Sequence, residues 1–243
     1  MSRSTSRRNW RLGVCVAVFA ASLVTAPAVL AQAASKLIAP GFAGLAKSDA
    51  VVMMPVDVEL FSMSAGGVLE PRADWTESAR GHMTTALVDR VKALGLPVKQ
   101  GNVDLADEFA EQVGLHAAVA TSISRHHAFG GVWALPTKAE GLNWTFGDAM
   151  QGLGRKADAR YGLFVWVRDS YASAERKAAM VLLALAGIGI TGGAQIGYAS
   201  LVDLQTGQVV WFNQLARGTG DLREDEPARE TIQSLLTGLP PVQ

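Results

Sequence analysis

The chain has 243 residues, of which 22 are basic and 22 are acidic, so its formal net charge is zero. This balance argues against nucleic acid as a partner, because binding to phosphates favours an excess of basic residues. Hydrophobic residues make up 49% of the chain, which is enough for one substantial core.

The first 31 residues have the pattern of a secretory signal peptide. A basic head that includes Arg7 and Arg8 precedes an apolar stretch from Leu12 to Val29, and small residues ending at Ala31 fit a cleavage site. A general secretory signal and a twin-arginine signal both fit the paired arginines. We therefore expect an exported, periplasmic protein, with association with the outer membrane as an alternative.

Cleavage near Ala31 changes the chemistry that is left. It removes Cys15, the one cysteine, so neither disulfides nor thiol catalysis are expected in the mature chain. It also removes four arginines and leaves 18 basic against 22 acidic side chains, a formal charge of −4. Residues 32–49 predict a loose lead-in, and residues 50–238 predict one α/β domain with an apolar, glycine-rich insertion at 175–193.

The predicted domain begins with a strand at 50–60. Its first half is continuously apolar and its second half alternates, which predicts a strand that starts buried and ends at an exposed edge. Pro55 cannot donate to a strand ladder, so it is expected at the point where the pairing changes. After the turn at Gly66 and Gly67, residues 68–72 are expected to pair back onto this strand.

Helical periodicity follows in two segments. Apolar residues recur on one face of the segment 74–94, behind a near match to a capping box that begins at Asp74. A short strand is expected at 98–100. A second amphipathic helix follows, for which Asp104 and Asp107 are the alternative caps.

The C-terminal half supplies most of the predicted sheet. A short helix at 145–156 precedes a strand at 161–168 that is apolar on both faces, as a central strand is. Two alternating segments, 198–204 and 209–213, flank a polar turn that contains a glycine and predict a hairpin, which a helix from Pro227 follows. This order predicts an α/β fold, a mixed β-sheet with helices packed on it and a C-terminal β-hairpin and helix.

Two passages resemble a known family. ADARYGLF at 157–164 is similar to the helix-to-strand passage "gADYvl" of TolB N-terminal-domain-like and CsgG-like bacterial envelope proteins, and LVDLQTGQVVW at 201–211 is similar to their "vrLvDlxTGeilW" hairpin. The resemblance implies a TolB N-terminal-domain-like α/β domain that serves envelope assembly, secretion or partner activation without catalysis. The chain departs from these mostly lipid-anchored proteins, because Cys15 precedes most of the apolar stretch and is a poor lipid-bearing site.

The insertion at 175–193 is the candidate contact surface. From Ala178 to Val202 the chain has no charge, and the helical part, about Glu175 to Gly187, is nearer the length of a buried or surface helix than that of a membrane span. A buried or self-associating helix, a membrane-surface segment and a spanning element are open alternatives. The expected partner is an envelope protein or a second copy of the chain, in a homo-oligomer, with membrane contact or pore formation as the alternative. The predicted contact residues are Met180, Leu183, Leu185, Ile188 and Ile190.

No catalytic, cofactor or metal site is expected. His116, His126 and His127 with Glu111 lack the spacing of a metal-binding motif. No Gly-x-Ser-x-Gly elbow occurs, and the glycines at 187–192 follow a helical run rather than the strand that a dinucleotide site needs. The protein is therefore expected to be non-enzymatic, with a hydrolase assembled from scattered residues as the remaining alternative.

Other chemistry-bearing residues have structural explanations. Arg168 and Asp169, at the end of a strand, are expected to form an ion pair at the rim of the sheet. Trp133, Trp144 and Trp166 are expected to be core aromatics, although tryptophans at a partner surface would be binding hot spots.

Overall fold

The computed structural model describes residues 36–138 and 141–243. The predicted signal peptide and its cleavage point near Ala31 lie outside these ranges. The strands are β1 Val51–Met53, β2 Asp57–Met63, β3 Leu69–Pro71, β4 Val98–Gln100, β5 Tyr161–Ala172, β6 Gln195–Asp203 and β7 Val209–Arg217. The helices are α2 Ala73–Ala93, α3 Val103–Glu108, α4 Ala110–Ile123, α5 Gln151–Ala157, α6 Ala174–Leu185 and α7 Asp225–Leu235, with short π or 3-10 turns at Ser124–Ala128, Gly131–Trp133, Pro136–Lys138 and Gly147–Met150.

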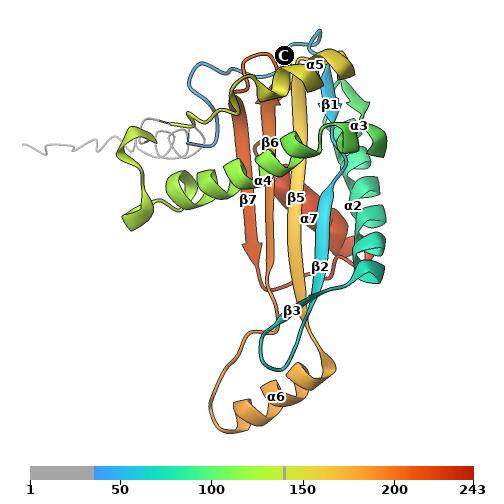
Figure 1. The fold of residues 1–243 in the computed structure, drawn as a ribbon, viewed down its shortest axis with the longest axis vertical. Coiled ribbons are helices and arrows are strands. Elements are labelled where there is room, and N and C mark those ends of the chain that lie inside the picture. The colour runs from blue at the N-terminus through green and yellow to red at the C-terminus, as the bar shows by residue number, and fades with distance from the viewer. Residues whose placement is uncertain (1–35, 139–140) are drawn as a thin grey trace, which may run out of the picture.

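The strand β5 is the centre of a seven-stranded mixed sheet (Figure 1). Along one edge it pairs in parallel with β1 and then with β2, and along the other edge it pairs antiparallel with β6. The sheet is extended by β4 beside β1, by β3 beside β2 and by β7 beside β6. The mixed sheet with packed helices confirms the predicted fold class, and the strand expected at 161–168 is its central strand.

The change of partner along the first predicted strand falls at Pro55. β1 lies between β4 and β5, whereas β2 lies between β3 and β5. Pro55 lies in the break between β1 and β2, where its nitrogen need not donate to a ladder. Because β3 covers only Phe61 to Met63, the earlier part of β2 forms an edge of the sheet, as the alternating pattern predicts.

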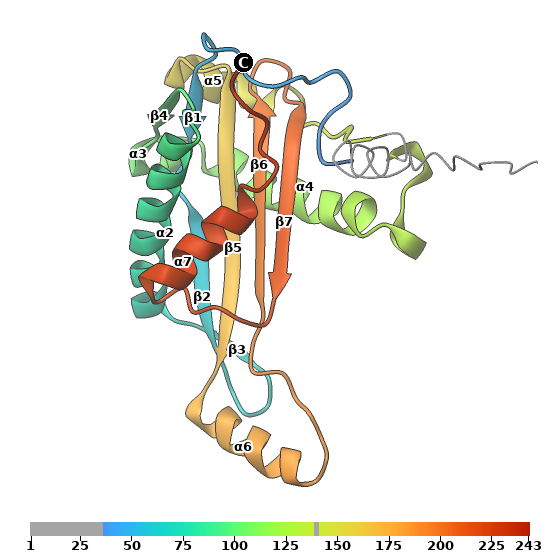
Figure 2. The same ribbon diagram turned by 180° about the vertical axis from the view of Figure 1, so that it is seen from behind.

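Helices cover the two faces of the sheet unequally. On one face α2 and α7 pack against alternate residues of β5 such as Leu163 and Val167 (Figure 2). On the other face α4 crosses only one half of the strands (Figure 1), where Ile123 packs with Phe164 and Phe212. Because successive strand residues point to opposite faces, β5 contributes side chains to both cores.

Two helix starts differ from the expected caps. The helix α2 begins at Ala73, so Asp74 lies inside the first turn and pairs with Arg72 at 2.8 Å instead of capping. An acidic residue in the first turn still interacts favourably with the helix dipole. Neither predicted aspartate caps α3; the Asn102 side chain does, accepting the Leu105 N–H at 3.0 Å.

The predicted hairpin is confirmed as β6 and β7. Asp203 Oδ1 accepts the N–H groups of Gln205 and Thr206 at 2.9 and 3.1 Å, which forms the turn. Gly207 has a φ of 71°, and a Cβ there would lie 2.0 Å from the Gly147 carbonyl oxygen, so the turn requires glycine. The final predicted helix is α7.

Candidate interaction surface

Between β5 and β6 the chain leaves the sheet and projects beyond the strand ends (Figure 1). We call residues 173–194 the α6 lobe. Ser173 caps its helix, with the hydroxyl accepting the Arg176 N–H at 3.2 Å. The helix ends at Leu185, and Gly187, two residues later, has a φ of 75°. There the N–H groups of Gly187 and the next residue bond carbonyls of the last turn at 3.0 and 2.9 Å, a Schellman arrangement.

A buried arginine fixes the position of the α6 lobe. Arg176 is 8% exposed, and its Nε donates to the Thr191 carbonyl at 2.9 Å. Its Nη1 donates to the carbonyls of Ser64 and Ala65, in the turn between β2 and β3, at 3.3 and 3.4 Å. One guanidinium therefore joins the start of α6, the returning chain and a neighbouring turn through charge-assisted hydrogen bonds.

The return of the chain to the sheet is also constrained. The Ser170 N–H donates to the Ala194 carbonyl at 3.1 Å, and the Ala194 N–H donates to Ser170 Oγ at 3.0 Å. Gly193 passes so close that a Cβ there would lie 1.9 Å from the Ser170 carbonyl oxygen. A larger residue at this position would have to displace the backbone of β5.

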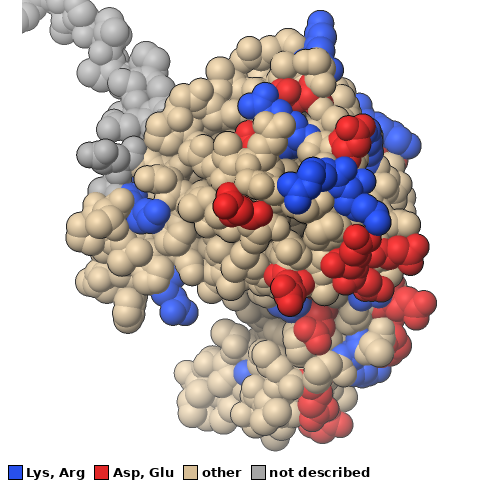
Figure 3. Space-filling model, turned by 45° about the horizontal axis from the view of Figure 1, so that its top comes forward, with Lys and Arg blue, Asp and Glu red and all other residues tan. Residues whose placement is uncertain are grey.

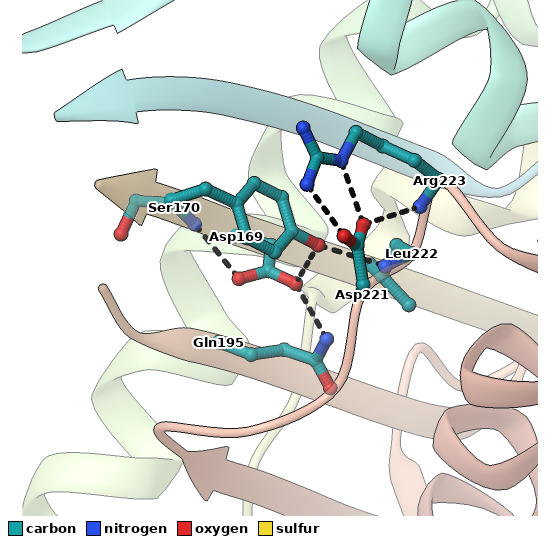
Figure 4. Close-up of polar contacts among 7 residues, drawn as sticks. Asp169, Ser170, Gln195, Asp221, Leu222 and Arg223 are labelled. Atoms are coloured by element: carbon teal, nitrogen blue, oxygen red, sulfur yellow. Dashed lines mark hydrogen bonds and ion pairs between the residues drawn. The ribbon is translucent and has the colours of Figure 1, made fainter. Parts of the chain in front are cut away.

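A buried polar network lies beneath the α6 lobe (Figure 4). Asp169 is 3% exposed and accepts hydrogen bonds from Tyr171 Oη and Gln195 Nε2, both at 2.6 Å, and from the Ser170 N–H at 2.8 Å. Burial raises the pKa of Asp169, against the opposing effect of these donors. Burial and the hydrogen bond to Asp169 raise the pKa of Tyr171, which therefore remains the donor. The carboxylate is satisfied internally, so the network stiffens the base of the lobe.

The ion pair expected between Arg168 and Asp169 is wrong. Adjacent residues of a strand point to opposite faces of the sheet, so the two side chains diverge. Arg168 instead pairs with Asp57 at 2.7 Å and Glu59 at 3.2 Å on β2, and its guanidinium lies 4.6 Å from the centre of the Trp166 ring.

A cleft of about 430 Å³ lies at the neck of the α6 lobe, between the β2–β3 hairpin and the starts of α2 and α6. Its charged lining residues have both signs: Glu70, Arg72, Glu175, Lys177 and Arg223. Arg72 pairs with Asp74, and Arg223 pairs with Asp221 and thereby lowers the pKa of that carboxyl (Figure 4). The neck therefore has no strong excess of positive charge.

The outer part of the α6 lobe is an exposed apolar surface. The side chains of Leu185, Leu182, Val181 and Ile188 are 84%, 68%, 63% and 50% exposed, and Arg176 is the buried residue of the helix. Figure 3 shows the lobe, at the bottom of the view, as mostly uncharged, whereas charged side chains gather on the right of the molecule. An exposed group of large apolar side chains is typical of a surface that contacts another molecule.

The predicted contact residues divide into two groups. Leu185 and Ile188 are exposed, whereas Met180, Leu183 and Ile190 are half-buried within the lobe. For example, the Met180 methyl group packs against Gly192 and lies 3.3 Å from the position that a Cβ on this glycine would occupy. The exposed apolar group therefore contains two of the five predicted contact residues.

Val181 and Leu182 are the exposed residues that the prediction missed. Both belong to the charge-free run, so the composition of the segment indicates them, but their orientation depends on the anchor at Arg176. Over the described ranges, no helix combines the length and the apolar character that crossing a membrane requires.

The sheet face beside the α6 lobe is uncovered over half its length. Among the described residues, no helix lies over the part of this face that α4 leaves free (Figure 1). We call this surface the open half of the sheet. The strand register places on it Asp57, Glu59, Phe61 and Met63 of β2, Trp166 and Arg168 of β5, Ile196 and Tyr198 of β6, and Gln214 of β7.

The open half of the sheet combines apolar and aromatic side chains with the ion pairs of Arg168. Half-buried Trp166 stacks on Tyr198, which is buried, with ring centres 5.1 Å apart, and Tyr198 stacks in turn on buried Phe212 at 5.9 Å. Ile196 is 41% exposed. The one arginine of this surface, Arg168, already has two carboxylate partners, so a covering group need not supply another.

The histidines are separated and have structural partners. His116 is buried, stacks on Phe164 at 5.0 Å and places Nε2 2.9 Å from Ser200 Oγ. Burial lowers the pKa of His116 to about 3, so the imidazole is neutral near pH 7. His126 Nδ1 and His127 Nε2 each lie 2.7 Å from a backbone carbonyl oxygen. Within residues 36–138 and 141–243, no group of three or more His, Cys, Asp or Glu is arranged to hold a metal ion.

The tryptophans are only partly in the core. Trp144 and Trp166 are half-buried against it, but Trp133 is 64% exposed, so its expected core position is wrong. Trp133 lies in a short turn after α4 with Phe129 and Val132, which are 67% and 94% exposed. Two consecutive glycines with positive φ lead into this turn and direct the chain away from the sheet. We call residues 129–133 the tip.

No family model matches the sequence, and no curated protein matches it. Among solved structures, the PelC dodecamer from Paraburkholderia phytofirmans is 16% identical, with a TM-score of 0.39, over 82% of this chain and 93% of that chain. The LpoB C-terminal domain from Salmonella enterica is 13% identical, with a TM-score of 0.29, over 74% and 87%. Lipoprotein GNA1162 from Neisseria meningitidis is 10% identical, with a TM-score of 0.29, over 77% and 93%. Likeness at these TM-scores does not establish a function.

Proposed function

We propose that this chain is an exported, non-enzymatic binding module of the cell envelope, a scaffold for envelope assembly or secretion, whose contact element is the α6 lobe. The signal-like N-terminus supports export. The observation that carries the proposal is the exposure of Val181, Leu182 and Leu185 on an ordered helix. These side chains contribute little to the chain's own core, so their apolar surface is available to a partner.

The anchoring of the α6 lobe supports a binding role over a loose loop. The guanidinium of Arg176 and the hydrogen bonds between Ser170 and Ala194 hold the helix at one position before any partner arrives. A preorganised element loses less conformational entropy on binding, so more of the apolar contact energy contributes to affinity.

The buried polar groups support a non-enzymatic role. The Asp169 carboxylate is occupied by three internal donors, and His116 is enclosed between aromatic rings with Ser200 as its polar partner. General acid–base catalysis requires a titratable group within hydrogen-bond reach of a substrate, and neither group is open to one.

Charge substitution within the α6 lobe tests the proposal. The variant Leu182→Glu with Leu185→Glu places two charges on the proposed contact surface, and Val132→Glu with Trp133→Glu does the same on the exposed tip as a matched control. After chemical cross-linking in intact cells, we expect the native chain and the control to give a species heavier than the monomer, and the lobe variant to lose it. Retention of that species in the lobe variant, or its absence from the native chain, would overturn the proposal.

Membrane-surface contact by the same lobe is the second candidate. It is favoured by the lack of charge in the outer part of α6. With 12 residues the helix is about 18 Å long, well short of the ~30 Å hydrocarbon core. The balanced charges at the neck also provide no basic collar for anionic headgroups. Co-sedimentation of the mature chain with vesicles of phosphatidylethanolamine and phosphatidylglycerol, lost in the lobe variant, would favour this candidate over a protein partner.

A further inference from the structure

Within the described residues, α6 covers neither face of the sheet, and the open half of the sheet is covered by no helix. The apolar side chains of Val181, Leu182 and Leu185 on α6 lie in solvent. Helices and sheets in stable domains bury their apolar sides against one another, so each of these two surfaces lacks the kind of partner that the other provides.

The α6 lobe does not occupy the open half of its own sheet. Arg176 bonds to Thr191 and to the turn at Ser64 and Ala65, which holds α6 beyond the ends of the strands and away from their face. The contact between helix and sheet is therefore available between copies of the chain.

We infer that the α6 lobe of one copy docks on the open half of the sheet of a second copy. This inference rests on the proposed function and names its partner. Such a contact joins two different surfaces of the chain, the α6 lobe of one copy and the sheet face of the next. Repeating the contact from copy to copy gives a closed ring or an open filament.

The dimensions and the chemistry of the two surfaces agree. Four strands, β2, β5, β6 and β7, spaced about 4.8 Å apart, span roughly 14 to 19 Å, and α6 is about 18 Å long. Half-buried Phe61, Met63 and Trp166 and exposed Ile196 offer an apolar and aromatic docking surface. The uncharged outer turns of α6 bring no unpaired charge to this docking surface.

The docking surface also continues an existing arrangement. The helix α4 already crosses the other half of the same face, with Ala120 and Ile123 packed on β-strand residues that include Phe212. A second helix beside α4, supplied by the neighbouring copy, would complete this layer of the sheet as α2 and α7 complete the opposite one.

Cysteine cross-linking in trans tests the inference, because residues 32–243 contain no cysteine. Purified Leu185→Cys carrying a tag is mixed with untagged Ile196→Cys and treated with a short bifunctional maleimide. Since a seated contact raises the local thiol concentration far above the bulk, we expect about tenfold more mixed dimer than with untagged Thr85→Cys, an exposed position on α2. Glu59→Cys, on a different strand of the open half, provides a second acceptor position that must behave like Ile196→Cys.

The outcomes separate this inference from the proposed function. Mixed dimers at the level of the Thr85→Cys control, or a Leu185→Cys homodimer as abundant as the mixed dimer, would overturn docking of α6 on the sheet. If the cross-linked species in cells still depends on Leu182 and Leu185 in that case, the proposed function stands with a different partner. If that dependence is also absent, both fail.

Discussion

The helices α2 and α6 distribute their side chains in opposite ways. In α2 the buried residues are apolar, with Met83 and Val91 fully covered by the sheet and α7. In α6 the buried residue is Arg176, while Leu182 and Leu185 lie in solvent. The apolar residues of α2 therefore stabilise this chain, whereas the exposed apolar residues of α6 contribute little to its stability and are free to stabilise a complex.

The largest expected difference between the two helices is in their contribution to folding. Met83→Ala truncates a fully buried side chain of α2 and is expected to lower the free energy of unfolding by about 2–5 kcal/mol. Leu185→Ala, on the exposed side of α6, is expected to change it by less than about 0.5 kcal/mol. Urea unfolding of the purified mature variants measures both values. A large loss of stability in Leu185→Ala would show that α6 belongs to the core and would contradict the difference between the two helices.

A smaller effect is expected from pH at the covered half of the sheet, beneath α4. Burial lowers the pKa of His116 from 6.5 to about 3, so the folded state disfavours the proton that the unfolded chain takes up. The stability that comes from burying a neutral imidazole is fully present above pH 6.5 and is lost as the pH falls toward 3. Between pH 7 and pH 5 the free energy of unfolding falls by about 2 kcal/mol from this cause. Between pH 7 and pH 5 the free energy of unfolding should fall by about 2 kcal/mol more in the native chain than in His116→Gln. Equal losses in urea unfolding would contradict the lowered pKa of His116.

An effect smaller than that of His116 is expected from the anchor of the α6 lobe. Arg176→Met leaves carbonyls at Thr191, Ser64 and Ala65 without their donor, but water can reach them once the lobe loosens, so the cost is about 1 kcal/mol. Limited proteolysis should instead cut the segment 186–194 several times faster. The exposed neighbour Lys177→Met is the matched control, and equal cleavage of the two variants would show that Arg176 does not hold the lobe.

The sequence predicts the sheet well, because its signals there are local. Alternation on both sides of a glycine-containing turn specifies the hairpin of β6 and β7, and the missing N–H of Pro55 marks the point where β1 gives way to β2. These features depend on residues close together in the chain, so they can be identified without knowledge of the fold.

The arrangement of the candidate surface depends on distant residues, so the sequence indicates it only in part. The charge-free run identifies the segment, but the side of α6 that faces solvent is set by bonds from Arg176 to Ser64 and Ala65, more than a hundred positions away. The predicted pair of Arg168 and Asp169 is wrong for a local reason: alternation along β5 places Asp169 on the opposite face, where Tyr171 and Gln195 are its partners.

In vivo photo-cross-linking at position 185 tests the central claim most directly. A benzophenone amino acid replaces Leu185 in one variant and exposed Thr85 of α2 in the other. If the α6 lobe is the contact surface, position 185 forms a discrete protein adduct in the cell envelope and position 85 does not. Equal labelling at both positions, or adducts with lipid alone at position 185, would contradict the claim.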